Sequence, residues 1–205
     1  MDKFSELLKK NKNDIIKPVA VLLAICIVIP LALALTNKLT ADRIAGLEKE
    51  KSKAAMQRLI EADEFELNSF SSENKFDYYT AKKSSEIIGY IFTTTAKGYG
   101  GEVSVMTAVN TDGSVKSVEI LDVSNETPGL GQNAAKENFY SQFEGKSGNV
   151  TLLKNGADAQ KQQVNAVTGA TITSRGITNA VNEALERFAE VQSADNQKEV
   201  AESEE

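Results

Sequence analysis

The sequence predicts an α+β protein in which a single N-terminal transmembrane helix precedes a body made of an antiparallel sheet and packed helices. Residues 18–37 form an apolar stretch without a charge. Residues 86–123 alternate between β-favouring and polar side chains, and the turn sequence NTDGS interrupts them. Residues 174–191 repeat apolar side chains at intervals of three and four, which is typical of a helix with one buried face.

Composition restricts the functions that this chain can have. Of its 23 Lys and Arg and 29 Asp and Glu residues, the first 38 positions hold six and three. The remainder therefore carries 17 basic and 26 acidic side chains, a net charge of −9. An acidic body without a basic stripe repels phosphate backbones, so we expect no nucleic-acid partner.

The residue types that are missing exclude several kinds of site. The chain has no His and no Trp, and Cys26 is its only cysteine. Zinc, haem and iron–sulfur sites rely on imidazole and thiolate ligands, and Ser-His-Asp or Cys-His catalysis needs a histidine. A carboxylate site for Mg²⁺ or Ca²⁺ stays open, but the sequence predicts no catalytic residue and no metal-ligating set. Redox chemistry would require an imported organic cofactor.

The apolar stretch, PVAVLLAICIVIPLALALTN, is long enough to cross a bilayer as a helix with a rise of about 1.5 Å per residue. Pro30 would kink or loosen this helix, which membrane helices tolerate when a neighbour covers the freed backbone. A cleaved signal peptide is the alternative, although the stretch is longer than a usual signal core. Lysines on both sides mean that charge alone does not determine the orientation.

A second helix is expected over residues 40–62, with Thr40 or Asp42 as its cap. Two interpretations are open for it: a stalk that packs on the body, or a solvated spacer. The remaining elements are expected as short strands and turns over 64–79, strands over 86–95, 102–110 and 115–123, a short helix over 134–143, strands over 150–153 and 164–167, a helix from Ser174 to Val191, and a disordered acidic tail after Gln192. The three central strands favour an antiparallel meander.

Two stretches could carry function. The first is ETPGLG at residues 126–131, where proline fixes one φ angle and the glycines permit positive φ or a close approach of a ligand. A tight loop with no ligand is the alternative, because Pro-Gly turns are common.

The second stretch is NAVTGATITSRG at residues 165–176, a turn between a short strand and a helix. A helix N-terminus presents unpaired N–H groups that suit a phosphate, and the threonines supply hydroxyls as donors or as points of ester attachment. A capped turn, with Thr173 or Ser174 as N-cap, is the alternative.

Together these stretches resemble a known family. VTGATITS is similar to the flavinylation motif of the FMN-binding domain in the G subunit of the Rnf ion-translocating electron-transport complex and in the C subunit of the related sodium-translocating NADH:quinone reductase. In that motif Asp, two variable residues and Ser or Thr precede Gly-Ala-Thr, and the last Thr carries FMN through a phosphoester bond. That position is Thr171 here. Residues 98–131 are similar to the family's strand–hairpin–ETPGLG block, and the resemblance covers about residues 86–188.

The resemblance implies a set of FMN-binding residues. They are Thr171 as the covalent attachment point, Thr168, Gly169, Ala170, Thr173 and Ser174 beside it, and Glu126, Thr127, Pro128, Gly129, Leu130 and Gly131 in the loop that closes next to the flavin. Two positions depart from the family: Asn165 stands where Asp is usual, and Ser124 stands where relatives often have His.

The resemblance also implies a division of the chain into a cytoplasmic N-terminus (1–17), a transmembrane helix (18–37), a juxtamembrane stalk (38–63), an FMN-binding domain on the extracytoplasmic side of the cell membrane (64–192) and the tail (193–205). Its implied function is electron relay between ferredoxin and NAD, coupled to Na⁺ or H⁺ translocation. The implied partners are the A, B, C, D and E subunits of the Rnf complex, above all the membrane flavin protein RnfD, together with a flavin transferase and membrane lipid. The C subunit of the quinone reductase, a stand-alone flavinylated carrier and a cofactor-free scaffold domain are the alternatives.

Overall fold

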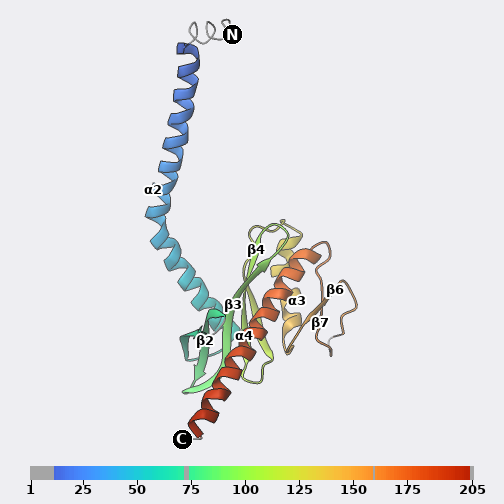
Figure 1. Ribbon diagram of the computed structural model, residues 1–205. Coiled ribbons are helices and arrows are strands. Elements are labelled where there is room, and N and C mark those ends of the chain that lie inside the picture. Colours follow the sequence, from blue (N-terminus) through green and yellow to red (C-terminus); the bar gives the residue numbers. More distant parts are fainter. Residues whose placement is uncertain (1–11, 72–73, 159, 204–205) are drawn as a thin grey trace, which may run out of the picture. The chain divides into compact units, whose positions relative to one another are not determined.

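The computed structural model describes residues 12–71, 74–158 and 160–203 (Figure 1). The chain divides into two compact units, residues 1–50 and residues 51–205. Helix α2, Lys12–Leu59, makes up the described part of the first unit, and its last turns belong to the second.

Helix α2 is continuous where two helices were expected. Thr40 lies inside it, and its hydroxyl donates a hydrogen bond to the Thr36 carbonyl oxygen over 2.9 Å. The prediction of a cap at Thr40 or Asp42 is therefore wrong. The segment TNKLTADR at residues 36–43 holds no Gly or Pro, so nothing in it stops a helix. The helix also continues through Pro30.

The first part of α2 has the properties of a membrane span. The most apolar window of 18 residues within residues 16–41 has a mean hydropathy of 2.9, and none of that window is buried against the protein. The 26 residues exceed the roughly 20 that a helix needs to cross the hydrocarbon core. The apolar side chains of this segment are therefore free to contact lipid.

The body is built on a five-stranded antiparallel sheet with the strand order β1-β2-β3-β4-β5. The strands are β1 (Glu64–Ser71), β2 (Lys75–Lys83), β3 (Glu86–Lys97), β4 (Glu102–Asn110) and β5 (Val115–Asp122). The Gly113 N–H donates to the Asn110 carbonyl oxygen and closes the turn between β4 and β5. The predicted meander is confirmed.

The chain after β5 forms short elements and one long helix: η1 (Gly131–Ala135), α3 (Glu137–Tyr140), η2 (Ser141–Phe143), β6 (Thr151–Leu153), β7 (Gln163–Asn165) and α4 (Thr171–Ser203). The short helix expected over 134–143 is divided among three elements. Strands β6 and β7 pair in parallel, which the sequence did not indicate.

Helix α4 differs from its prediction at both ends. It begins at Thr171, three residues before Ser174, and it continues to Ser203 instead of giving way to a disordered tail after Gln192. Residues 193–203 contain Ala, Glu, Lys and Gln and neither Gly nor Pro, so their helix propensity sustains the helix. Glu204 and Glu205 lie outside the described residues.

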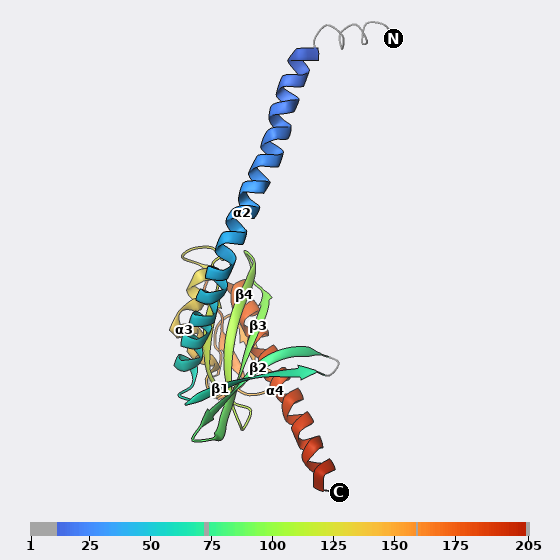
Figure 2. The ribbon, with the colours of Figure 1, turned by 90° about the vertical axis from the view of Figure 1, so that its left-hand side faces the viewer.

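The pleat of the sheet divides the apolar side chains between two cores. In Figure 2 the last turns of α2 lie in front of the sheet and α4 lies behind it. Ile91 and Met106 point to the face covered by the last turns of α2. Phe92 and Val105, their neighbours along the strands, point to the face covered by α4. The Ser117 hydroxyl also donates to the Leu59 carbonyl oxygen over 2.6 Å, which satisfies an end of α2. The stalk interpretation therefore holds for these last turns.

We expect Leu59→Ala to destabilise the body by about 2–5 kcal/mol, because Leu59 is 4% exposed in the core under α2 and its loss leaves a cavity. Urea unfolding of the chain in detergent, followed by circular dichroism, measures this change. Gln57→Ala, two residues away on the exposed side, should change stability by less than about 0.5 kcal/mol. Equal effects of both changes would contradict the packing of α2 on the sheet.

Candidate functional site

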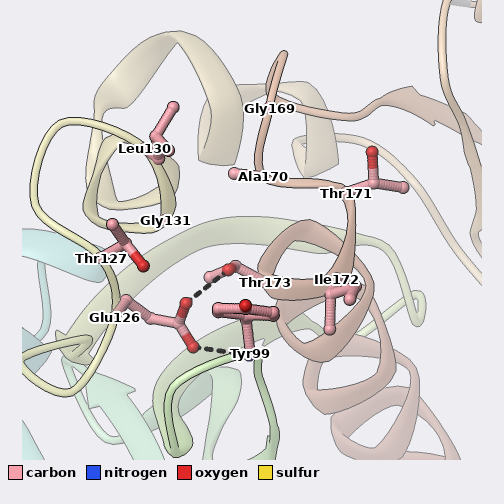
Figure 3. A pocket seen from close by; sticks show the side chains of 10 residues that line it. All are labelled: Tyr99, Glu126, Thr127, Leu130, Gly131, Gly169, Ala170, Thr171, Ile172 and Thr173. Carbon is pink, nitrogen blue, oxygen red and sulfur yellow. Dashed lines mark hydrogen bonds between the residues drawn. The ribbon is translucent and has the colours of Figure 1, made fainter.

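Three segments that are far apart in the sequence meet around one pocket of about 580 Å³ (Figure 3). They are the loop between β3 and β4, the loop after β5 and the start of α4. The lining residues are Tyr99, Glu126, Thr127, Leu130, Gly131, Gly169, Ala170, Thr171, Ile172 and Thr173. The volume lies within the range of about 300–1,000 Å³ that is usual for small-molecule sites.

The same kind of turn shapes two walls of this pocket. In each four-residue turn, the N–H of the last residue donates a hydrogen bond to the carbonyl oxygen of the first. The two bonds run from Leu130 to Thr127 over 3.2 Å and from Ala170 to Val167 over 2.9 Å. The third residue, Gly129 or Gly169, has φ of +76° or +79°. This is the type II pattern, which requires positive φ at that position and favours Pro at the second, where Pro128 stands.

A buried carboxylate joins all three segments (Figure 3). Glu126 is 2% exposed, and its Oε1 accepts hydrogen bonds from the backbone N–H groups of Tyr99 (2.8 Å) and Gly100 (3.1 Å). Its Oε2 accepts a hydrogen bond of 2.6 Å from the Thr173 hydroxyl in the first turn of α4. Glu126 therefore fixes the positions of two pocket walls relative to the loop that carries it.

Two glycines leave the space that this carboxylate needs. A β-carbon at Gly98 would overlap Glu126 Oε1, and one at Gly131 would overlap Oε2. Because glycine has no β-carbon, the backbones of both loops can approach the carboxylate more closely than any other residue would permit.

The start of α4 offers unpaired hydrogen-bond donors to the pocket. Among the described residues, the backbone N–H groups of Thr171, Ile172 and Thr173 have no acceptor, since they belong to the first turn of the helix. The partial positive charge of this helix end favours a negatively charged group. A phosphate placed here would receive backbone hydrogen bonds and a favourable field.

The three threonines of the second motif have different surroundings. The Thr173 hydroxyl is buried and engaged with Glu126, and Thr168 lines a neighbouring pocket. Thr171 is half-buried at the main pocket, and in the part of the chain that the structure describes its hydroxyl makes no hydrogen bond (Figure 3). Among these three, only Thr171 both lines the main pocket and has a hydroxyl without a hydrogen bond in the described part of the chain.

Apolar side chains with unusually high exposure surround the opening. Tyr99 is 70% exposed, Ile172 50% and Leu130 47%, although each lines the pocket. Exposed apolar groups gathered at one concave place indicate a surface that a ligand or partner covers. A flat aromatic ring system suits such a rim.

Most of the predicted site residues line this pocket. Pro128, Gly129, Thr168 and Ser174 do not. Ser174 is buried, and its hydroxyl oxygen accepts a hydrogen bond from the Val167 N–H over 3.0 Å. The alternative with Thr173 or Ser174 as N-cap is wrong, because both lie inside α4.

Sequence reasoning missed Tyr99 and Ile172, which contribute much of the apolar rim. A signal existed for Tyr99: it is an aromatic residue between glycines in KGYGG, at the end of a β-hairpin. Ile172 had none, because an apolar residue at the start of a helix usually belongs to the core.

The two positions that depart from the family pattern lie outside the main pocket. Asn165 Oδ1 accepts a hydrogen bond from the Ala157 N–H over 2.9 Å, and Asn165 lines the neighbouring pocket with Thr168. Ser124 is exposed, and its N–H donates to the Asp122 carboxylate over 2.7 Å. The hydrogen bonds from Ser124 lower the pKa of Asp122.

Among the described residues, no group of three or more His, Cys, Asp or Glu side chains is arranged to hold a metal ion.

Residues 98–186 match the family model of the FMN-binding domain, which is the class that the fold and the pocket define. The chain is 34% identical over 180 residues to the G subunit of the proton-translocating ferredoxin:NAD(+) oxidoreductase complex of Clostridium ljungdahlii, covering 87% of this chain and 94% of the relative. It is 32% identical over 185 residues to the G subunit of the Na(+)-translocating complex of Acetobacterium woodii, covering 82% and 88%. The chain therefore belongs to the G-subunit family of ion-translocating ferredoxin:NAD⁺ oxidoreductase complexes, as its motifs predicted.

A solved structure shares the fold. The crystal structure of NqrC from Shewanella oneidensis matches with a TM-score of 0.53 and 21% identity, over 62% of this chain and 69% of that one.

The residues of the pocket fit FMN. The free N–H groups at the start of α4 would hold its phosphate, and Tyr99, Leu130 and Ile172 would contact its ring.

We expect Gly131→Ala to destabilise the body by about 1–3 kcal/mol and to reduce its FMN content, because the added methyl group overlaps the Glu126 carboxylate. Thermal unfolding and flavin absorbance of the purified chain measure the two effects. Gly46→Ala is the control: no heavy atom lies within 4 Å of its β-carbon position, and Ala is favoured over Gly inside a helix, so this change should lower neither value. Wild-type behaviour of Gly131→Ala would show that the loops do not close tightly around Glu126.

Proposed function

We propose that this chain is an electron-transfer subunit that carries FMN covalently, through a phosphoester bond to Thr171. The observation that carries the proposal is the free Thr171 hydroxyl beside three unpaired N–H groups at the start of α4. Attachment joins Thr171 Oγ1 to the FMN phosphorus, with loss of the hydroxyl proton and of the group that the phosphate carried in the donor used by a flavin transferase.

The chain's own contribution is binding and orientation. The first turn of α4 stabilises the phosphate charge, the turn at Gly169 keeps the backbone clear of the bulky group, and the apolar rim contacts the ring. When bound, FMN supplies the ring that accepts and donates electrons. The carboxylate of the pocket is held by three hydrogen bonds from the protein, which suits a relay that binds and orients its cofactor.

We place this relay in an Rnf-type complex. The relatives are named as subunits of ferredoxin:NAD(+) oxidoreductases that translocate protons or Na⁺, and the aligned regions cover most of both chains. Helix α2 would anchor the chain in the lipid of the cell membrane, with the FMN domain on the extracytoplasmic side. The A, B, C, D and E subunits, especially the membrane flavin protein RnfD, would exchange electrons with it or supply the ferredoxin and NAD sites, and the coupled ion is Na⁺ or H⁺.

Two alternatives are less well supported. The resemblance to NqrC, at 21% identity, concerns the fold, whereas the G-subunit relatives reach 34% identity, so a component of a quinone reductase or a stand-alone carrier is disfavoured. A cofactor-free scaffold would leave the apolar rim and the unpaired N–H groups without a purpose.

We expect Thr171→Ala to abolish covalent FMN while the fold is retained, because it removes one half-buried hydroxyl that makes no hydrogen bond in the described part of the chain. The measurement is the intact mass of the denatured chain after co-expression with a flavin transferase, with the site located by fragment mapping. Thr171→Ser should keep the attachment.

Thr151→Ala is the control, since it removes an exposed threonine of β6 that lies outside the motif and lines neither the main nor the neighbouring pocket. It should retain full modification. Covalent flavin on the Thr171→Ala chain would rule out the assignment, and so would an unmodified wild-type chain from a host whose transferase modifies other proteins.

A further inference from the structure

We propose that Glu126 is a positioning residue whose buried negative charge also lowers the redox potential of the flavin in this pocket. The inference rests on the proposed occupancy of the pocket by FMN. It assigns Glu126 a role different from that of a cofactor ligand, because both of its carboxylate oxygens are already engaged with the protein.

The hydrogen bonds identify the form of the carboxylate. Its three partners, the Tyr99 N–H, the Gly100 N–H and the Thr173 O–H, are all donors. Backbone N–H groups can only donate, so Oε1 carries no proton, and two donors on one oxygen favour the ionised carboxylate. The Thr173 hydroxyl donates to Oε2 here, although a hydroxyl is also able to accept. The two N–H donors on Oε1 are the geometric basis for treating Glu126 as an anion at the floor of the pocket.

No cationic side chain balances this charge. The ion pairs of the described residues do not include Glu126, and no Lys or Arg lines the pocket. The remaining opposing charge is the partial charge of backbone N–H groups and of the first turn of α4, which Glu126 reaches through Thr173. A buried charge with so little compensation exerts a strong local field, because water does not screen it.

This field acts on the electron-accepting group. Two-electron reduction of FMN with uptake of one proton leaves the ring with one additional negative charge. A carboxylate facing the same pocket raises the free energy of that reduced form relative to the oxidised form. Glu126 therefore makes the bound flavin a stronger reductant.

Two substitutions separate the charge from the positioning. Glu126→Gln keeps the shape: its Oε1 still accepts from Tyr99 and Gly100, and the Thr173 hydroxyl can rotate to accept from the new amide. Glu126→Asp keeps the charge but is too short to reach all three donors. We also use Glu86→Gln, which removes an exposed carboxylate at the end of β3 opposite to the Tyr99 loop.

The test combines the midpoint potential of the loaded full-length chain in detergent with amide hydrogen exchange of Tyr99 and Gly100 in flavin-free chain. Glu126→Gln should keep the exchange protection and shift the reduction equilibrium at least tenfold towards reduced flavin, about +30 mV for a two-electron couple. Glu126→Asp should lose protection while the potential stays near that of the wild type. Glu86→Gln should change neither value.

The outcomes distinguish this inference from the proposed function. A loaded Glu126→Gln chain with the wild-type potential overturns the role of the charge and leaves the proposed function intact. Equal potential shifts in the Gln and Asp variants would assign the effect to geometry and overturn it as well. If the Glu126→Gln chain does not bind flavin, the Glu126→Asp chain is the deciding variant. An unchanged midpoint potential despite lost exchange protection supports the role of the charge, and a shifted potential overturns it. A wild-type chain without flavin refutes both proposals.

Discussion

The pocket of this protein depends on the placement of one carboxylate. Glu126 holds the Tyr99 loop through two backbone N–H groups and holds the first turn of α4 through Thr173. Each of these segments has its own support, since the strands belong to a meander and α4 packs on the sheet. The hydrogen bonds of Glu126 join their ends, so the shape of the site depends on satisfying one buried carboxylate.

The constraint explains why glycines gather in these loops. A carboxylate that accepts from backbone groups on both sides requires the backbone to come close, and Gly98 and Gly131 provide that approach. The type II turns at Gly129 and Gly169 then direct Leu130 and Thr171 to the same pocket, and a β-carbon on Gly169 would lie 3.0 Å from Leu130 Cδ2. The absence of a side chain at these glycines is therefore required by contacts between the loops, whether or not a ligand is bound.

The sequence predicted the elements whose patterns are long and regular. The meander and the helix around Ile177 were found because periods of two and of 3.6 residues persist over several repeats. The predicted start of α4 is three residues late. Residues 171–173 do not continue the apolar periodicity by which the rest of the helix was recognised. The parallel pair β6–β7 has only three residues per strand, too few for a period.

The site was predictable as a set of loops but not as a set of roles. The sequence assigned the same role, contact with the flavin, to all six residues of ETPGLG. The structure shows that Glu126 is buried, that Leu130 belongs to the exposed rim of the pocket, and that Pro128 shapes the turn. The threonines also differ in their surroundings. The hydroxyl environments of Thr171 and Thr173 depend on the side of α4 to which each points and, for Thr173, on Glu126, which is 47 residues away in the sequence. A motif records which residues are present; burial and hydrogen bonding decide what each one does.

The electrostatics of the pocket give a physical reason for the covalent link that we propose. A phosphate bound reversibly would meet the partial charge of one helix end, with Glu126 nearby and with no Lys or Arg in the lining. Helix-end stabilisation of about 0.3–1 kcal/mol offsets little of the loss of freedom on binding, which is at least about 4 kcal/mol. The proposed bond to Thr171 would remove that cost permanently and would hold the ring at a high effective concentration beside Tyr99, Leu130 and Ile172. The anionic floor can then act on the electron affinity of the ring without determining whether the cofactor stays.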